Sequence, residues 1–258
     1  MIPALAGLTD AAGPWLLAAC AVFLRVGAAM ALLPAFGERT VPVRIRLMLA
    51  LGFTLIVMPG IVPMLPPIDS GMLIGRWLLS ETVIGLAIGA VLRLFVLGLQ
   101  IAGSIAAQSV SLAQIFGGQA LEPQPAIGHV LVIAGLALAV MAGLHVKIAM
   151  FLTLSYDLMP PGRLPDAADL MEWGLQRTSH AFALGFTLAA PFVVTSLLYN
   201  LALGVINRAM PQLMVAFVGA PAITAGGLVL LALAAPLMLR VWLSAMDVFL
   251  AAPREIVP

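Results

Sequence analysis

The sequence predicts an all-α polytopic membrane protein, and three observations carry that prediction. Hydrophobic residues make up 63% of the 258-residue chain and charged residues only 9%, with a mean hydropathy of +1.15. This composition leaves too little polar surface for a soluble domain of the same length. The apolar segments are long and rich in Leu and Ala, without the alternation of barrel strands, so helices must satisfy the backbone in lipid.

Proline, glycine and charged residues divide the chain into segments long enough to cross a bilayer, for which about 20 apolar residues suffice. We expect these segments at about 11–34, 47–62, 73–116, 126–154, 178–206 and 222–245. A polar turn follows the first segment, and the one hydrophilic stretch precedes the fifth. We expect a single domain, 1–258, because no Ser/Gly linker or low-complexity tail divides the chain.

The third segment is too long for one simple crossing. As one helix it would measure about 65 Å at 1.5 Å per residue, roughly twice the hydrocarbon thickness. We expect it either to turn back near Gly98 to Gly103 or to extend well beyond the membrane.

Arginines beside segment ends predict the orientation. Arg39, Arg44, Arg46 and Arg208 lie at such ends, whereas the 157–177 stretch is slightly acidic. The positive-inside rule then places the turns at 38–46 and 208 in the cytoplasm and 157–177 outside.

Polar side chains follow one face of the third segment. At 100° per residue, six of them fall within about 120° of one another. They are Arg93, Gln100, Ser104, Gln108, Ser111 and Gln114. Such a stripe either bonds neighbouring helices, at around 0.6 kcal/mol per bond, or faces a water-filled conduit. Lipid exposure is disfavoured, because an arginine in mid-helix costs roughly 2.5–3.5 kcal/mol on insertion scales.

A second group of polar residues lies between Asn200 and Pro221, inside a long apolar region. A shared helix face predicts tight packing for Ser196, Asn200, Gly204 and Asn207. Pro211 removes a backbone donor, and Gly219-Ala220-Pro221 interrupts the helix pattern again. Irregular backbone at membrane depth survives only when buried in protein or lining a cavity. A gate or a partner contact is therefore favoured here over a passive kink.

Two pairs of glycines have structural interpretations, and the sequence contains no known catalytic motif. Gly117-Gly118, after Phe116, allows either a surface turn or a constriction that changes shape. Gly85 and Gly89 predict close helix packing. The chain has no metalloprotease, nucleophile-elbow, phosphate-loop or dinucleotide motif, and Cys20 is its single cysteine. We expect no catalytic, cofactor or metal site.

Three stretches of the chain resemble the FliR family of flagellar export-gate proteins and its type III secretion counterparts in injectisomes. They are Phe23-Leu24-Arg25, the turn from Pro34 to Arg46, and the region from Asn200 to Pro221. The third contains the Asn-Arg-x-x-Pro-Gln core, here Asn207 to Gln212, followed by Gly219-x-Pro221. The resemblance covers nearly the whole chain in order and length.

The resemblance implies a non-enzymatic core subunit of the flagellar type III protein export gate, in the bacterial inner membrane at the flagellar basal body. FliP-like and FliQ-like subunits would be its partners, with FlhA- and FlhB-like proteins and a soluble ATPase beneath. Unfolded flagellar proteins would pass through the gate. Its helices would be kinked into hairpins and assembled into a larger helical complex. Neither the resemblance nor the net charge of +1 predicts a nucleic-acid partner.

The resemblance also assigns roles to residues. A plug-like loop would span about 109–125, including Phe116, Gly117 and Gly118, and would close the conduit beside the Arg93 stripe. Family members often carry Asp-Pro after the aromatic residue, and Gly-Gly in its place predicts a looser plug. Helix breaks and partner contacts are expected at Arg25, Arg44, Arg46, Asn200, Asn207, Arg208, Pro211, Gln212, Gly219 and Pro221.

A small-solute secondary transporter is the alternative, because such proteins also contain broken helices and intramembrane polar groups. Coupled transporters usually need an intramembrane acid, and Glu81 is the only acid well inside an apolar segment. An intramembrane enzyme is disfavoured, since no catalytic set is present.

Overall fold

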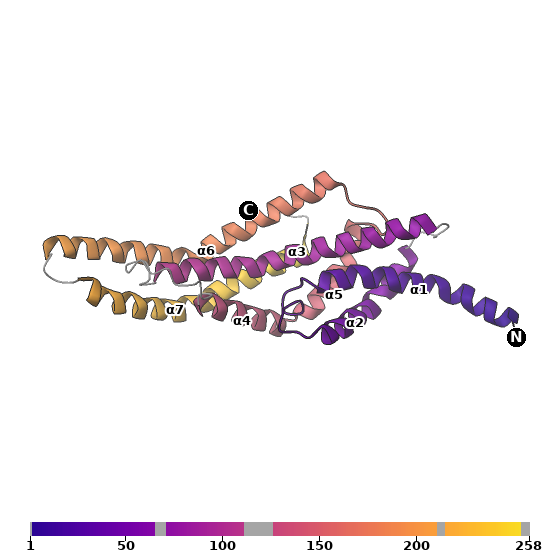
Figure 1. Ribbon diagram of the computed structural model, residues 1–258, viewed down its shortest axis with the longest axis horizontal. Helices are drawn as coiled ribbons and strands as arrows, with labels where there is room; N and C mark the ends of the chain where they lie inside the picture. The colour runs from indigo at the N-terminus through magenta and orange to yellow at the C-terminus, as the bar shows by residue number, and fades with distance from the viewer. Residues whose placement is uncertain (1, 65–70, 111–125, 211–214, 254–258) are drawn as a thin grey trace. The chain divides into compact units, whose positions relative to one another are not determined.

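The computed structural model describes residues 2–64, 71–110, 126–210 and 215–253 (Figure 1). All regular structure in these ranges is helical, which confirms the all-α prediction. The helices are α1 (Ile2–Met30), α2 (Val43–Ile61), α3 (Gly71–Ser109), α4 (Ala126–Met141), α5 (Leu144–Leu158), α6 (Ala167–Ala209) and α7 (Val215–Ala251). A short 3-10 turn, η1 (Val62–Met64), follows α2.

Several of these helices are long and apolar enough to cross a membrane. They include Val43–Met64, Gly75–Ser109, Ala167–Ala209 and Pro221–Ala251. The pair α4 and α5 would make a fifth span, bent by 75° at its break. The chain is therefore a polytopic membrane protein, as its composition predicted.

Helix α3 shows that the long third segment is one continuous helix as far as Ser109. It runs without a break for 39 residues, about 58 Å at 1.5 Å per residue, so of the two alternatives the turn back near Gly98 to Gly103 does not occur. The two glycines admit neighbouring backbone instead. A Cβ on Gly98 would lie 3.3 Å from the Ala181 carbonyl oxygen, and one on Gly103 would overlap Gly128.

The fourth segment, expected as one helix, is divided by a glycine. Gly143 has φ +81°, a left-handed conformation that side chains resist, and it separates α4 from α5. The bend of 75° follows from this one residue, which an otherwise apolar sequence pattern does not reveal.

The hydrophilic stretch 157–177 is shorter as a connection than expected, since α6 begins at Ala167. Asp166 starts the helix: its Oδ1 accepts a hydrogen bond of 2.8 Å from the Ala168 amide. Much of the polar stretch therefore forms the first turns of α6, and the connection proper is residues 159–166.

Prolines lie inside several of the described helices. Pro59 lies inside α2, which continues to Ile61, and Pro221 lies inside α7. The expected break at Gly219 to Pro221 is therefore wrong. A proline removes one backbone hydrogen bond, and a long apolar helix tolerates that loss where neighbouring groups compensate.

The chain divides into two compact units. Unit 1 contains residues 1–94, 140–177 and 249–258, and unit 2 contains residues 95–139 and 178–248. In unit 1, wholly buried apolar residues of α1, α3 and α5 form the core, among them Val22, Val26, Ile84, Leu92 and Leu152. The single-domain expectation stays a prediction.

Unit 2 has its own core around Trp242 of α7. This indole is wholly buried, and its Nε1 donates a hydrogen bond of 2.8 Å to the Phe95 carbonyl. Leu99, Leu131 and Phe192 are also fully buried. Parts of α3, α4, α6 and α7 thus pack on one another within this unit.

Candidate functional sites

A wholly buried ion pair lies at the centre of unit 1. Arg25, near the C-terminal end of α1, donates from Nε to Glu81 Oε2 at 2.8 Å and from Nη2 to Glu81 Oε1 at 3.2 Å. Both side chains are 0% exposed. Bidentate pairing is the strongest form of this contact, and a buried pair is tolerated only when its other polar atoms are also satisfied.

The remaining donors of Arg25 reach the end of α5. Nη1 donates to Ser155 Oγ at 3.1 Å, and Nη2 donates to the Met159 carbonyl at 3.0 Å. The Tyr156 ring lies 3.6 Å from the guanidinium carbon, a cation–π contact. Glu81 Oε1 also accepts a hydrogen bond of 3.2 Å from the Gly162 amide. One polar cluster thus joins α1, α3, α5 and the connection after α5.

Small residues allow α1 and α3 to approach closely enough for this pair. A Cβ on Gly89 would lie 2.6 Å from the Ala29 carbonyl oxygen, and one on Gly85 would overlap the Arg25 carbonyl. The close packing that the sequence predicted at these two glycines is therefore present.

The Arg25–Glu81 pair was not predicted from the sequence. Arg25 was expected among helix breaks and partner contacts, whereas it lies inside α1, near its C-terminal end, with partners inside its own chain. A signal was available. Each residue is a lone charge in an apolar segment, and two such charges of opposite sign are expected to neutralise each other.

A second ion pair in unit 1 joins Arg93 of α3 to Glu38 in the connection between α1 and α2. The side chains are 30% and 21% exposed, so solvent screens this pair more than the first. Arg93 was expected to face a conduit with the rest of its stripe, and here its charge is engaged within the chain.

Arg46 holds the same connection by backbone contacts. Its Nη2 donates to the Glu38 carbonyl at 3.0 Å, with the Gly37 and Val41 carbonyls at 3.4 and 3.5 Å. Arg44 lies two residues earlier, in the first turn of α2, and is exposed. Arg46 therefore closes the turn that precedes α2.

The rest of the α3 stripe is described only in part. Gln100 and Ser104 are half-buried and Gln108 is exposed, all within unit 2. The remaining conduit and plug residues lie outside the described residues. They are Ser111, Gln114, Phe116, Gly117 and Gly118.

The end of α6 in unit 2 exposes apolar and polar side chains together. Leu197, Leu198, Leu201 and Val205 are 62–68% exposed, and Asn200, Asn207 and Arg208 are exposed among them. The residues between Val193 and Met210 that are less exposed form one stripe: Ser196, Tyr199 and Leu203. We call Val193–Met210, apart from this stripe, the α6 end surface.

The less exposed stripe faces α7. Tyr199 donates from its hydroxyl to the Gly219 carbonyl at 2.6 Å, and Leu203 lies near the buried Gly219. Gly204 has no neighbour within 4 Å for an added Cβ, so the tight packing expected on the Asn200–Asn207 face is not formed within the described chain. Helix α6 ends at Ala209, whereas Pro211 and Gln212 lie outside the described residues, and Pro221 is exposed on α7.

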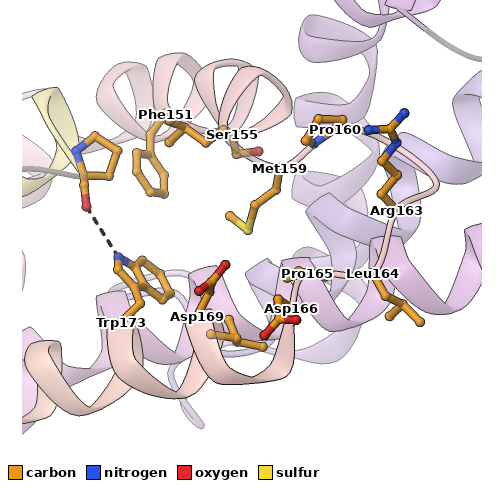
Figure 2. Close-up of a pocket in the computed structure, with 13 residues that line it drawn as sticks. Phe151, Ser155, Met159, Pro160, Arg163, Leu164, Pro165, Asp166, Asp169 and Trp173 are labelled. Carbon is orange, nitrogen blue, oxygen red and sulfur yellow. Dashed lines mark hydrogen bonds between the residues drawn. The ribbon is translucent and has the colours of Figure 1, made fainter.

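A cavity of about 450 Å³ opens in unit 1 beside the connection between α5 and α6 (Figure 2). Its walls are largely apolar, including Phe151 and Trp173, and Asp169 and Met159 point toward its middle. Trp173 Nε1 and Arg177 Nη2 both donate to the Pro253 carbonyl, at 3.4 and 2.8 Å. No group of three potential metal ligands occurs among the described residues.

Comparison with known proteins identifies the family. The model for "Bacterial export proteins, family 1" matches residues 16–249. The chain is 36% identical over 227 residues to the flagellar biosynthetic protein FliR of Caulobacter vibrioides, covering 87% of this chain and 90% of that protein. It is 28% identical to FliR of Escherichia coli K12, over 83% of each chain, and 28% identical to FliR of Bacillus subtilis 168, over 78% of this chain and 79% of that one.

These matches agree with the residues that carried the resemblance, and their span covers, in whole or in part, each α-helix of the described residues. The helices long enough to cross a bilayer place the protein in a membrane. The chain belongs to the FliR family of bacterial export proteins, as a component of the flagellar export apparatus.

Proposed function

We propose that this chain is a non-enzymatic core subunit of the flagellar type III export gate in the bacterial inner membrane, where it helps form and close the conduit for unfolded flagellar proteins. Family membership supports the export role. The α6 end surface supports the role of a subunit, and it is the observation on which the proposal rests.

The α6 end surface suits neither water nor lipid. Four of its apolar side chains are more than 60% exposed and would be costly in water, since burial is worth about 25 cal/mol per Å² of apolar area; they are Leu197, Leu198, Leu201 and Val205. Its Asn200 and Asn207 carry amides that would be costly in hydrocarbon without hydrogen-bond partners, and Arg208 adds a charge in the last turn of α6. A protein partner can cover the apolar side chains and hydrogen-bond the polar ones.

We assign this surface to FliP-like and FliQ-like subunits, with FlhA- and FlhB-like proteins as further members of the assembly. Arg44, Pro211 and Gln212 remain proposed partner contacts or helix breaks on the strength of the family resemblance, and Pro221, inside α7, remains a proposed partner contact. The half-buried Gln100 and Ser104 and the exposed Gln108 are proposed to face the conduit or its walls. Residues 109–125 are proposed to act as its plug.

The contacts of Glu81 in unit 1 argue against the alternative of a small-solute transporter. A coupled transporter needs an intramembrane acid that can bind its ion, and Glu81 was the one candidate inside an apolar segment. Both Glu81 oxygens accept hydrogen bonds from Arg25, and Oε1 also accepts the Gly162 amide. The carboxylate therefore serves the fold.

Affinity purification of the tagged chain with its partners tests the proposal. Arg208→Ala should reduce recovery of FliP-like and FliQ-like subunits several-fold, because it removes a donor from the α6 end surface. Arg163→Ala, an exposed arginine in unit 1, is the matched control and should recover the complex fully. Full recovery with Arg208→Ala would assign that residue another role.

The plug proposal has its own test. Replacing Gly117-Gly118 with Val-Val or Ile-Ile restricts the backbone at the proposed closure. We expect changed ion leak across the membrane or changed export of flagellar proteins, measured in cells that carry the variant on a deletion background. Unaltered leak and export would remove residues 109–125 from the gate.

A further inference from the structure

The connection between α5 and α6 in unit 1 is held by backbone contacts to a side-chain pair. The Met159 carbonyl accepts a hydrogen bond of 3.0 Å from Arg25 Nη2, and the Gly162 amide donates one of 3.2 Å to Glu81 Oε1. Arg25 belongs to α1 and Glu81 to α3, so both ends of the Met159–Gly162 turn are tied to helices far away in sequence.

The turn itself is shaped for this position. Pro160 and Pro161 stiffen it, and Gly162 takes φ +74°, which side chains resist. A Cβ on Gly162 would lie 2.6 Å from Trp77 Cδ1, so the glycine backbone also packs closely on an α3 side chain. Pro161 is buried, which shows that the turn packs against the rest of unit 1.

A pair that only cancelled charge would not need these contacts. Arg carries five N–H donors in a planar fork, and a carboxylate has about four acceptor positions. Arg25 and Glu81 can therefore bind each other through two hydrogen bonds and still offer one bond each to the backbone of the turn.

We propose that Arg25 and Glu81 are positioning residues, which hold the Met159–Gly162 turn against α1 and α3 and so define where α6 starts. Helix α6 carries the α6 end surface, so export through the gate depends on this pair. That last step rests on the function proposed above, whereas the positioning itself does not.

The decisive variant keeps unit 1 folded but removes the contacts to the turn. Arg25→Met combined with Glu81→Leu replaces the pair by apolar side chains, a change that buried ion pairs often tolerate in stability. We expect the purified full chain to keep its yield and melting temperature. Amide hydrogen exchange in residues 159–164 should become about tenfold faster or more, because local opening sets the exchange rate, and flagellar export should fall.

A charge exchange gives a second, independent variant. Arg25→Glu with Glu81→Arg keeps both charges but presents a carboxylate to the Met159 carbonyl and a guanidinium to the Gly162 amide. We expect this variant to leave residues 159–164 rapidly exchanging. Restored protection and export in the exchanged pair would show that charge compensation alone is needed, and would overturn the proposal.

The Arg93–Glu38 pair supplies the matched control in the same unit. Arg93→Met with Glu38→Leu should leave exchange in residues 159–164 as in the unaltered chain. Normal protection of residues 159–164 in the Arg25→Met, Glu81→Leu protein would also overturn the proposal.

If the double variant does not accumulate in cells, the single variant Glu81→Gln can be tested in its place. Its amide oxygen cannot serve Arg25 and Gly162 as fully as a carboxylate, so exchange should rise in residues 159–164 but not in α2. An equal rise in both segments would indicate general destabilisation and contradict a positioning role. Failure of the unaltered gene to restore export in a deletion strain would instead overturn the proposed function and leave the exchange result standing.

Discussion

Gly103 of α3 and Gly128 of α4 meet so closely that a Cβ on Gly103 would overlap the Gly128 backbone, whereas a Cβ on Gly128 would sit 3.6 Å from Gly103. The contact is therefore asymmetric. Only one of the two glycines is required for the helices of unit 2 to cross at this distance, although both look alike in the sequence.

We expect Gly103→Ala to destabilise the purified protein by about 1–3 kcal/mol, because overpacking forces the two helices apart. Gly128→Ala should change stability by much less, since its Cβ makes ordinary contacts. Gly226→Ala is a further control, as nothing lies within 4 Å of its added Cβ. Thermal unfolding in detergent micelles measures all three, and equal losses for Gly103 and Gly128 would contradict the asymmetry.

Glu81→Ala should be far more destabilising than Glu38→Ala. The first leaves Arg25 buried without its counter-charge, a change that costs about 3–5 kcal/mol in other buried pairs. The second breaks a partly exposed pair, where about 0–1 kcal/mol is typical. The two melting temperatures, measured under the same conditions, check the difference, and similar shifts would argue that Arg25 finds other compensation.

Two glycines with positive φ should respond differently to alanine. Gly143→Ala meets backbone strain alone, about 1–2 kcal/mol, because nothing lies within 4 Å of the added Cβ. Gly162→Ala meets the same strain and must also displace Trp77. We expect the greater loss of thermal stability for Gly162→Ala, and the reverse order would mean that the Trp77 side chain yields without cost.

Tyr199→Phe should loosen α6 from α7 in unit 2. It removes the hydrogen bond of 2.6 Å to the Gly219 carbonyl, worth about 0.5–1.5 kcal/mol. Hydrogen exchange in residues 196–209 should rise. Thr195→Val is the matched control, because the Thr195 hydroxyl donates to the Pro191 carbonyl of its own helix. If both variants exchange alike, the Tyr199 bond does not hold the two helices together.

Much of the candidate site could be located, though not assembled, from sequence. The polar residues near the end of α6 were recognised because amides and an arginine are costly in an apolar segment. Their exposure was not, since the shared helix face predicted tight packing for Asn200 and Asn207, and only the family resemblance implied partner contacts there. Whether a polar face packs inside its own chain or against another depends on neighbours that local sequence does not specify.

The sequence by itself determined the fold class, the membrane location and the family, because composition, segment length and the Asn207 to Gln212 motif are local properties of the chain. Only the tertiary structure decided that Arg25 binds Glu81, that Gly143 bends the fourth segment, and that α3 continues past Gly98 and Gly103. Each of these depends on residues distant in sequence or on one backbone torsion angle. The hydrophobic pattern of a sequence predicts which side chains are buried away from water. It does not predict which partner each buried polar group binds.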